Sequence, residues 1–167
     1  MTAKELQVLY EYDRWANEKL LHVIAQLTPE QFTQSIAGAY GSVRNTMVHV
    51  LSAEWGWLDR CGGATRGGRL KPADYQTIES LMQLWATIEG HLREFLSRLK
   101  DEDLARIVEY DFGEGPNTST LGELMHHGAI HAVHHRGQVA VLLRSIGVVP
   151  GNFDILFFYA EKRVLAA

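Results

Sequence analysis

The chain has 167 residues, 46% of them hydrophobic and 22% charged, with a formal net charge of −4. This composition indicates one folded globular domain over residues 1–167 rather than a disordered chain, and the scattered basic residues argue against a nucleic-acid partner. The single cysteine, Cys61, excludes an internal disulfide and a multi-cysteine zinc site. With no signal-peptide core in residues 1–8 and no apolar run of about 18 residues, we expect a cytoplasmic protein that is not inserted in a membrane.

The first predicted helix spans residues 2–27. Its apolar positions recur every three or four residues, as an amphipathic helix requires: Leu6, Leu9, Tyr10, Ala16, Leu20, Ile24 and Leu27. Asp13 lies on the same stripe, so one acid is expected to face the core. Because buried acids need partners, Asp13 either pairs with an arginine, accepts an indole or imidazole hydrogen bond, or supports a metal ligand.

Residues 29–40 are predicted to be a connection, and a second helix should cover residues 43–61 with Ser42 as its N-cap. His49 lies on this helix beside small residues. Taken alone, a histidine in such a place is more often a hydrogen-bonded core residue than a metal ligand. The glycine-rich segment 62–69 is interpreted as a mobile surface loop, and a third helix is predicted over residues 76–99.

A short strand or hairpin is predicted before the last long helix. Residues 106–112 alternate in polarity and are followed by a turn sequence at 113–117. Thr118, Ser119 or Thr120 can cap the fourth helix, and Glu123 completes a capping-box pattern with Thr120. This helix should run to about residue 146 and stop at Gly147.

A final short helix is predicted over residues 152–163, with Asn152 as its cap. The residues expected to pack it against the protein are Phe153, Leu156, Phe157 and Ala160. Four long helices, each with one apolar side, predict an all-α antiparallel bundle.

The fourth helix is rich in histidine. Five of the eight histidines of the chain lie within ten residues: His126, His127, His131, His134 and His135. Residues three or four apart share a helix face, and three pairs meet this condition: His127 with His131, His131 with His134, and His131 with His135. The last pair overlaps best with the apolar stripe, and His49 is available as a third ligand. Neutral imidazoles favour zinc, nickel, copper or iron(II), although the same histidines also fit an ordinary bundle without a metal.

Three segments resemble the DinB family. Residues 131–138, His-Ala-Val-His-His-Arg-Gly-Gln, with Leu143, Arg144, Gly147 and Asp154 after them, resemble its H-x-x-x-H-R-G-Q…L-R-x-x-G…D signature. Residues 12–17 are similar to Y-N-x-W-A-N, with Asp13 where the family commonly has asparagine, and residues 41–49 are similar to G-S-x-x-x-x-x-x-H. The resemblance extends over nearly the whole chain.

This resemblance implies an up-down-down-up four-helix bundle, often a homodimer, with a divalent metal held by His49, His131 and His135. Zinc and nickel are the expected metals. The implied function is a metal-dependent enzyme acting on a small molecule, either a transferase with a low-molecular-weight thiol as cosubstrate or a hydrolase. The alternative is a metal-binding stress-response protein or a dimeric scaffold without turnover.

The sequence leaves more than one role for several other polar residues near these segments. The acids that could take part in the chemistry are Asp13, Glu54, Glu123 and Asp154. His127, one turn before His131, is expected behind the ligands or in the wall of the pocket. Arg136 is expected to pair with a carboxylate or a dimer partner, and Gln138 to hydrogen-bond a ligand or a helix neighbour.

Overall fold

The computed structural model describes residues 1–62, 68–111 and 115–165. Residues 63–67 of the predicted surface loop, residue 112 of the predicted strand and residues 113–114 of the predicted turn therefore lie outside the described residues.

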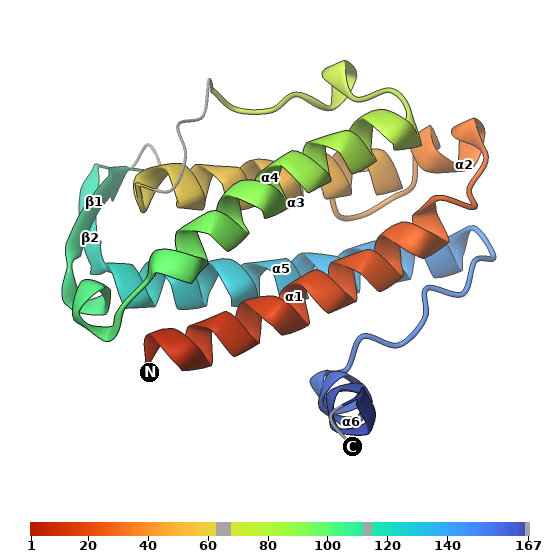
Figure 1. Ribbon diagram of the computed structural model, residues 1–167. Coiled ribbons are helices and arrows are strands. Elements are labelled where there is room, and N and C mark those ends of the chain that lie inside the picture. The colour runs from red at the N-terminus through yellow and green to blue at the C-terminus, as the bar shows by residue number, and fades with distance from the viewer. Residues whose placement is uncertain (63–67, 112–114, 166–167) are drawn as a thin grey trace.

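Four long helices lie side by side and form the body of the molecule (Figure 1). They are α1 (Ala3–Ile24), α3 (Val43–Arg60), α4 (Ile78–Arg98) and α5 (Leu121–Ser145). Helices α1 and α3 each contact both α4 and α5. In Figure 1, α1 and α5 run in one direction and α3 and α4 in the opposite one. The four predicted long helices are all present, with ends that differ from the prediction by a few residues.

Side chains at the helix ends explain where the helices begin and stop. Ser42 Oγ accepts the backbone N–H of Asn45, as predicted for the N-cap of α3. Of the three candidate caps for α5, Thr120 is the one used: its Oγ1 accepts the N–H of Glu123, and the Glu123 carboxylate accepts the N–H of Thr120. Helix α5 ends before Gly147, which has a φ of 80°.

The prediction of a plain connection over residues 29–40 is wrong in its first part, because α2 (Pro29–Thr33) is a short helix. Thr28 and Gln31 form a capping box, and Pro29 occupies the first turn, where its missing N–H costs nothing. Phe32 is fully buried and anchors this helix to the core formed partly by α3. Its side chain thus holds the start of the connection against the bundle.

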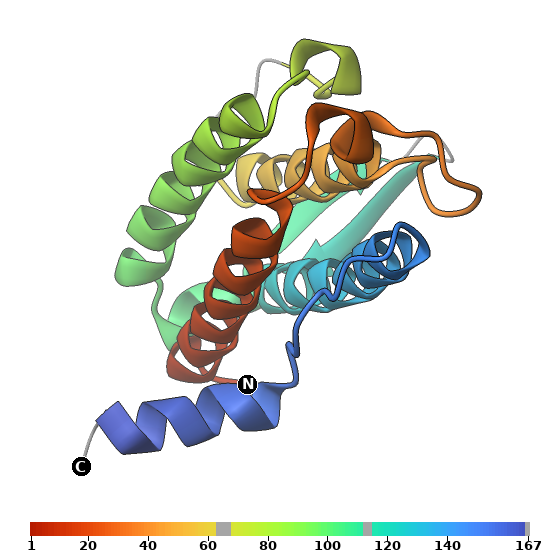
Figure 2. The same ribbon diagram turned by 90° about the vertical axis from the view of Figure 1, so that its right-hand side faces the viewer.

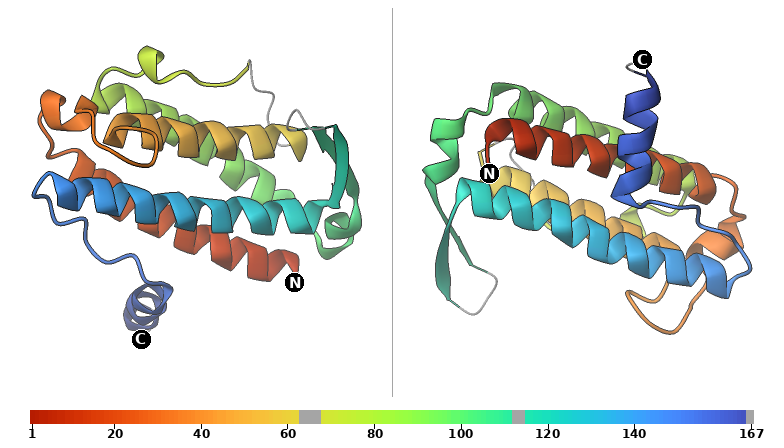
Figure 3. Two further views of the ribbon diagram at one scale, coloured as in Figure 1. Left: turned by 180° about the vertical axis from the view of Figure 1, so that it is seen from behind. Right: turned by 90° about the horizontal axis from the view of Figure 1, so that it is seen from below.

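The predicted hairpin is present and closes one end of the bundle between α4 and α5 (Figure 3). Strands β1 (Ile107–Asp111) and β2 (Pro116–Thr120) are antiparallel, with Ile107 opposite Thr120 and Asp111 opposite Pro116. Two 3-10 helices, η1 (Pro72–Asp74) and η2 (Asp101–Ala105), lie in the connections before α4 and before β1.

The bundle core consists of two apolar clusters separated by polar residues. One cluster lies toward the hairpin and includes Leu6, Trp57, Leu92 and Leu124; the other includes Leu20, Met47, Leu81 and Leu143. Along the helices, several polar side chains with buried atoms fall between these two sets: Asp13 and Asn17 on α1, Glu54 on α3, Glu89 on α4 and Arg136 on α5. A polar layer therefore crosses the middle of the bundle.

Helix α6 (Ile155–Leu165) lies outside the bundle and crosses α1 (Figure 2). The predicted packing of this helix is wrong for most residues: Leu156 and Phe157 are 72% and 50% exposed, and Ala160 is exposed as well. Phe158 is buried instead, with its ring 5.9 Å from those of Tyr12 and Trp15. The reason is that α6 touches the bundle on one side only.

The start of α6 also differs from the prediction. Asn152 Oδ1 accepts the N–H of Asp154 in the turn that precedes the helix, so the helix begins at Ile155. Among the described residues, no helix combines the length and the apolar character needed to cross a membrane.

Candidate metal centre

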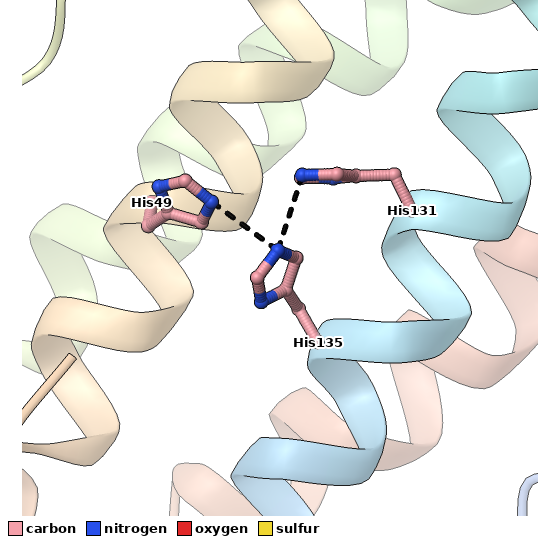
Figure 4. A group of neighbouring side chains, drawn as sticks. All are labelled: His49, His131 and His135. Carbon is pink, nitrogen blue, oxygen red and sulfur yellow. Dashed lines mark hydrogen bonds between the residues drawn. The ribbon is translucent and has the colours of Figure 1, made fainter. Parts of the chain in front are cut away.

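Three histidine side chains from two adjacent helices converge on one point (Figure 4). His49 comes from α3, and His131 and His135 come from α5. The Nε2 atom of His135 lies 3.2 Å from Nε2 of His49 and 3.1 Å from Nε2 of His131. One ligand atom from each residue can be chosen so that all three lie within 4.8 Å of one another. Nitrogens bound to one tetrahedral zinc, at about 2.0–2.1 Å from the ion, are about 3.4 Å apart, so the cluster can hold a metal.

The local sequence explains this convergence. Four residues separate His131 from His135, which places both rings on one face of α5. Helices α3 and α5 pack along their lengths, and this brings His49 to the same level from the other side. The alternative pairs, His127 with His131 and His131 with His134, do not form the cluster. His126, His127 and His134 are exposed and lie outside it.

The three imidazoles are held in the neutral form that a metal ligand requires. Burial, followed by the influence of His135 and Arg69, lowers the pKa of His49 to about 4. Burial and the neighbouring histidines lower the pKa of His131 to about 4 as well. Burial also lowers the pKa of His135, whose residue is only 6% exposed. At neutral pH each of the three rings therefore keeps a lone pair on one of its two nitrogens.

Two side chains orient the histidines. Gln138 Oε1 lies 2.7 Å from His135 Nδ1, and its Nε2 lies 3.1 Å from Nε2 of the exposed His134. Gln138 was expected to hydrogen-bond either a proposed ligand or a helix neighbour, and its partners are His135, one of the proposed ligands, and His134. Tyr40 stacks on His49, with ring centroids 3.9 Å apart, and its hydroxyl lies 2.9 Å from His49 Nε2.

Tyr40 was not predicted from the sequence as a residue of the site. It lies in the loop before α3, where Gly38, Ala39 and Gly41 have φ values of 100°, 45° and 84°. The side chain of Asn45 holds this loop by donating to the carbonyl of Tyr40. The only available signal was an aromatic residue between two glycines next to a helix cap, which does not indicate a functional residue by itself.

The proposed supporting residues fall in different places. His127 lies beside the cluster, with its ring 4.9 Å from that of Trp57 and 5.7 Å from that of His131, so it lines the adjoining hollow. Glu123 caps α5, and Asp154 is exposed in the turn before α6. Within the described residues, no carboxylate belongs to the three-histidine group.

Asp13 and Arg136 form an ion pair in the core. Arg136 Nη1 donates to Asp13 Oδ1 and, at 3.0 Å, to Asn17 Oδ1. Asp13 and Arg136 are 2% and 3% exposed. A partner of this kind was among those predicted for each residue. Because they pair with each other in the core, both are structural residues of the bundle rather than members of the histidine cluster.

Glu54 belongs to the same polar layer. Burial, with Asp13 and Glu89 nearby, holds the pKa of its carboxyl group well above the ordinary value. Its Oε2 is buried without a hydrogen-bond partner among the described residues.

A hollow of about 440 Å³ opens beside the histidines. His49, His127 and His131 line it together with Trp57, Arg60 and Asp111. Its volume is in the range of small-molecule sites, roughly 300–1,000 Å³. Trp57, Arg60 and Asp111 were not predicted as pocket residues, because Trp57 and Arg60 lie on α3 and Asp111 on β1, and only the tertiary fold brings these elements around one hollow.

The fold and the cluster define a class of protein: a helical bundle in which two neighbouring helices present three histidines able to hold a divalent metal. Comparison with known sequences gives the family. The sequence model of the DinB family matches residues 1–163, and the chain therefore belongs to the DinB family.

Known relatives agree with this membership. The chain is 25% identical to Protein DinB of Bacillus subtilis (strain 168) over 162 residues, which cover 92% of this chain and 94% of the relative. It is also 25% identical to the uncharacterized protein YizA of the same organism, over 84% of this chain and 87% of YizA.

Two crystal structures share the fold. The first is a DinB-like protein from Bacillus cereus ATCC 10987, with a TM-score of 0.66 and 24% identity over 90% of this chain and 97% of that one. The second is a conserved protein from Enterococcus faecalis, with a TM-score of 0.56 and 16% identity over 83% and 94%. At these identities the likeness supports the fold alone.

Proposed function

We propose that the protein is a metal-dependent enzyme in which His49, His131 and His135 hold a divalent transition metal, zinc or nickel. The observation that carries the proposal is the convergence of the three Nε2 atoms, at 3.1 and 3.2 Å, from two different helices. Three protein ligands leave coordination positions for a substrate, and the adjoining hollow of about 440 Å³ gives a small molecule access to them.

The proposed reaction is a thiol-dependent transfer, with a low-molecular-weight thiol as cosubstrate, or a hydrolysis. A bound metal would act as a Lewis acid and lower the pKa of the water or thiol that it coordinates. The residues of the chain hold and orient the site. Gln138 accepts a hydrogen bond from His135 Nδ1, which leaves Nε2 of that ring as the ligand atom. Tyr40 places a hydroxyl group beside His49 Nε2.

A non-catalytic metal-binding protein is the second candidate. The observation that favours it is that, among the described residues, the group of His49, His131 and His135 includes no carboxylate that could act as a base. In this case the protein binds its metal in a stress response or serves as a scaffold.

We further propose a cytoplasmic homodimer built on the up-down-down-up bundle of the family. Exposed apolar side chains support an interface on the outer side of α5: Ile130, Val133 and Val141 are 51%, 39% and 64% exposed. Sedimentation of the purified chain will give its oligomeric state.

The test of the enzymatic proposal is metal-dependent turnover. Protein without a histidine tag is loaded with zinc or nickel and incubated with thiol and electrophile pairs, and separately with ester and amide substrates. We expect turnover that His131→Ala abolishes and that His126→Ala, an exposed histidine on the same helix, retains. Metal binding without turnover across both panels would favour the second candidate.

A further inference from the structure

Two hollows meet at the histidine cluster. The hollow of about 440 Å³ extends from His49 toward Trp57 and Arg60. A second hollow, of about 370 Å³, extends from His49 toward Tyr40 and Lys71. Both are lined by His49, Ser52 and Arg69, so Arg69 lies where the two hollows join, beside the proposed metal position.

The charged side chains that line these hollows are mostly cationic. Arg60, Arg69 and Lys71 contribute positive charges, and Asp111 is the one acid among the lining residues that the structure describes. A divalent metal held by the histidines would add two more positive charges. This positive region contrasts with the net charge of −4 of the whole chain. Such a cleft attracts anions and repels cations.

Arg69 has donors available for a ligand. Its side chain is exposed and makes no hydrogen bond or ion pair with the described residues. Arg60 is positioned by its own contacts: its guanidinium lies 5.2 Å from the Trp57 ring, and Nη1 donates to the carbonyl of Gly56. An arginine beside the cleft can form two parallel hydrogen bonds to a carboxylate or phosphate.

Another hollow of the molecule provides a contrast. A hollow of about 500 Å³ between α1 and α4 also contains arginines, but no histidine of the cluster lines it. There, Arg14 and Arg93 both lie within salt-bridge distance of Glu89, at 3.9 and 3.4 Å. The positive charges of that hollow are therefore compensated within the protein, whereas the charge of Arg69 is not paired in this way.

We propose that the ligand of the histidine cleft is an anionic small molecule whose carboxylate or phosphate group is bound by Arg69, while another atom of the same molecule faces His49, His131 and His135. This inference deepens the proposed function and rests on it for the metal. It does not require turnover, because it concerns binding only. Because the anionic group of the ligand lies at Arg69, the opposite end of the ligand lies at the metal.

The experiment measures binding of matched thiols to zinc-loaded protein by calorimetry. The probes are 3-mercaptopropionate, 2-mercaptoethylphosphonate, neutral 2-mercaptoethanol and cationic cysteamine. Since the carboxylate or phosphonate of a probe can also touch zinc directly, the decisive quantity is the dependence of affinity on Arg69. We expect Arg69→Gln to weaken the anionic probes at least about tenfold and to leave 2-mercaptoethanol unchanged.

The matched control is Arg98→Gln, because Arg98 is an exposed arginine on α4 that pairs with Glu94 and lies outside both hollows. It should change no affinity. The carboxylate and phosphonate probes distinguish the two anion types. An Arg69→Gln effect equal for neutral and anionic probes, loss of zinc in Arg69→Gln, or no measurable binding of any probe would each overturn the proposal. Absence of turnover with an intact Arg69 effect would overturn only the enzymatic function.

Discussion

Gln138 Oε1 lies 2.7 Å from Nδ1 of His135, one helical turn away on α5. Because the amide oxygen can only accept, this contact places the proton of the neutral ring on Nδ1. The Nε2 atom, which faces His49 and His131, then keeps its lone pair. Gln138 thus selects the tautomer of His135 that a metal requires.

Replacing Gln138 should weaken metal binding. We expect Gln138→Ala to lower zinc affinity about 10–100-fold, because removing a residue that orients a ligand histidine has effects of this size. A competition titration with a zinc chelator measures it. Gln83→Ala, on the exposed surface of α4, is the control and should bind zinc as the parent does. Equal affinity in the two variants would show that the hydrogen bond does not matter.

The buried pair of Asp13 and Arg136 should be essential for stability. Asp13→Ala leaves a buried guanidinium without its counter-charge and is expected to cost about 3–5 kcal/mol in the free energy of unfolding. Asp13→Asn should cost less, since the amide keeps an acceptor for Arg136. Urea unfolding measures both, with exposed Asp74→Ala as the control. A loss below about 1 kcal/mol for Asp13→Ala would contradict the pairing.

Gly128 is predicted to tolerate no side chain. A Cβ at this position would lie 2.8 Å from the hydroxyl of Tyr10, which is buried and donates to the carbonyl of Met125. We expect Gly128→Ala to cost about 1–3 kcal/mol of stability. Gly90→Ala, a helical glycine with open space around it, should instead gain up to about 1 kcal/mol.

A double variant tests the cause of the Gly128 effect. Tyr10→Phe removes the atom that the new Cβ would meet, so Gly128→Ala should cost much less in this background. Thermal unfolding of the four proteins of the cycle gives the coupling energy. Additive effects of the two substitutions would place the constraint elsewhere.

Glu89 should make stability depend on pH. Burial, opposed by Arg93 and Arg14, raises the pKa of its carboxyl group from 4.5 to about 7. The folded state therefore binds more protons than the unfolded state between these pH values, and the contribution of Glu89 to stability falls as the pH rises through this interval. The difference in the free energy of unfolding between Glu89→Gln and the parent should therefore be more favourable to the variant at pH 8 than at pH 5. An equal difference at the two pH values would contradict this prediction.

The sequence predicts the local features of this fold well. Periodic apolar residues indicate the four long helices, and the Thr120 and Glu123 capping box marks the start of α5 because both partners are three residues apart. The burial of Asp13 follows from its place on the apolar stripe of α1. Local spacing also makes His131 and His135 neighbours.

Contacts between distant segments could not be predicted in the same way. Asp13 and Arg136 were each expected to need a partner, but 123 positions separate them and only helix packing makes them a pair. Tyr40 reaches His49 through the geometry of a loop, and its sequence context is not specific. Helix α6 has apolar residues around its circumference, so its pattern does not indicate that Phe158 is the buried one.

The central claim is that His49, His131 and His135 together hold one metal ion, and zinc content after equilibrium dialysis tests it most directly. The proteins needed are the parent without a histidine tag, the three single alanine variants and His126→Ala. The account predicts about one zinc per chain in the parent and in His126→Ala, and loss of zinc in each of the other three. Zinc retained in all three of those variants, or absent from the parent, would contradict it.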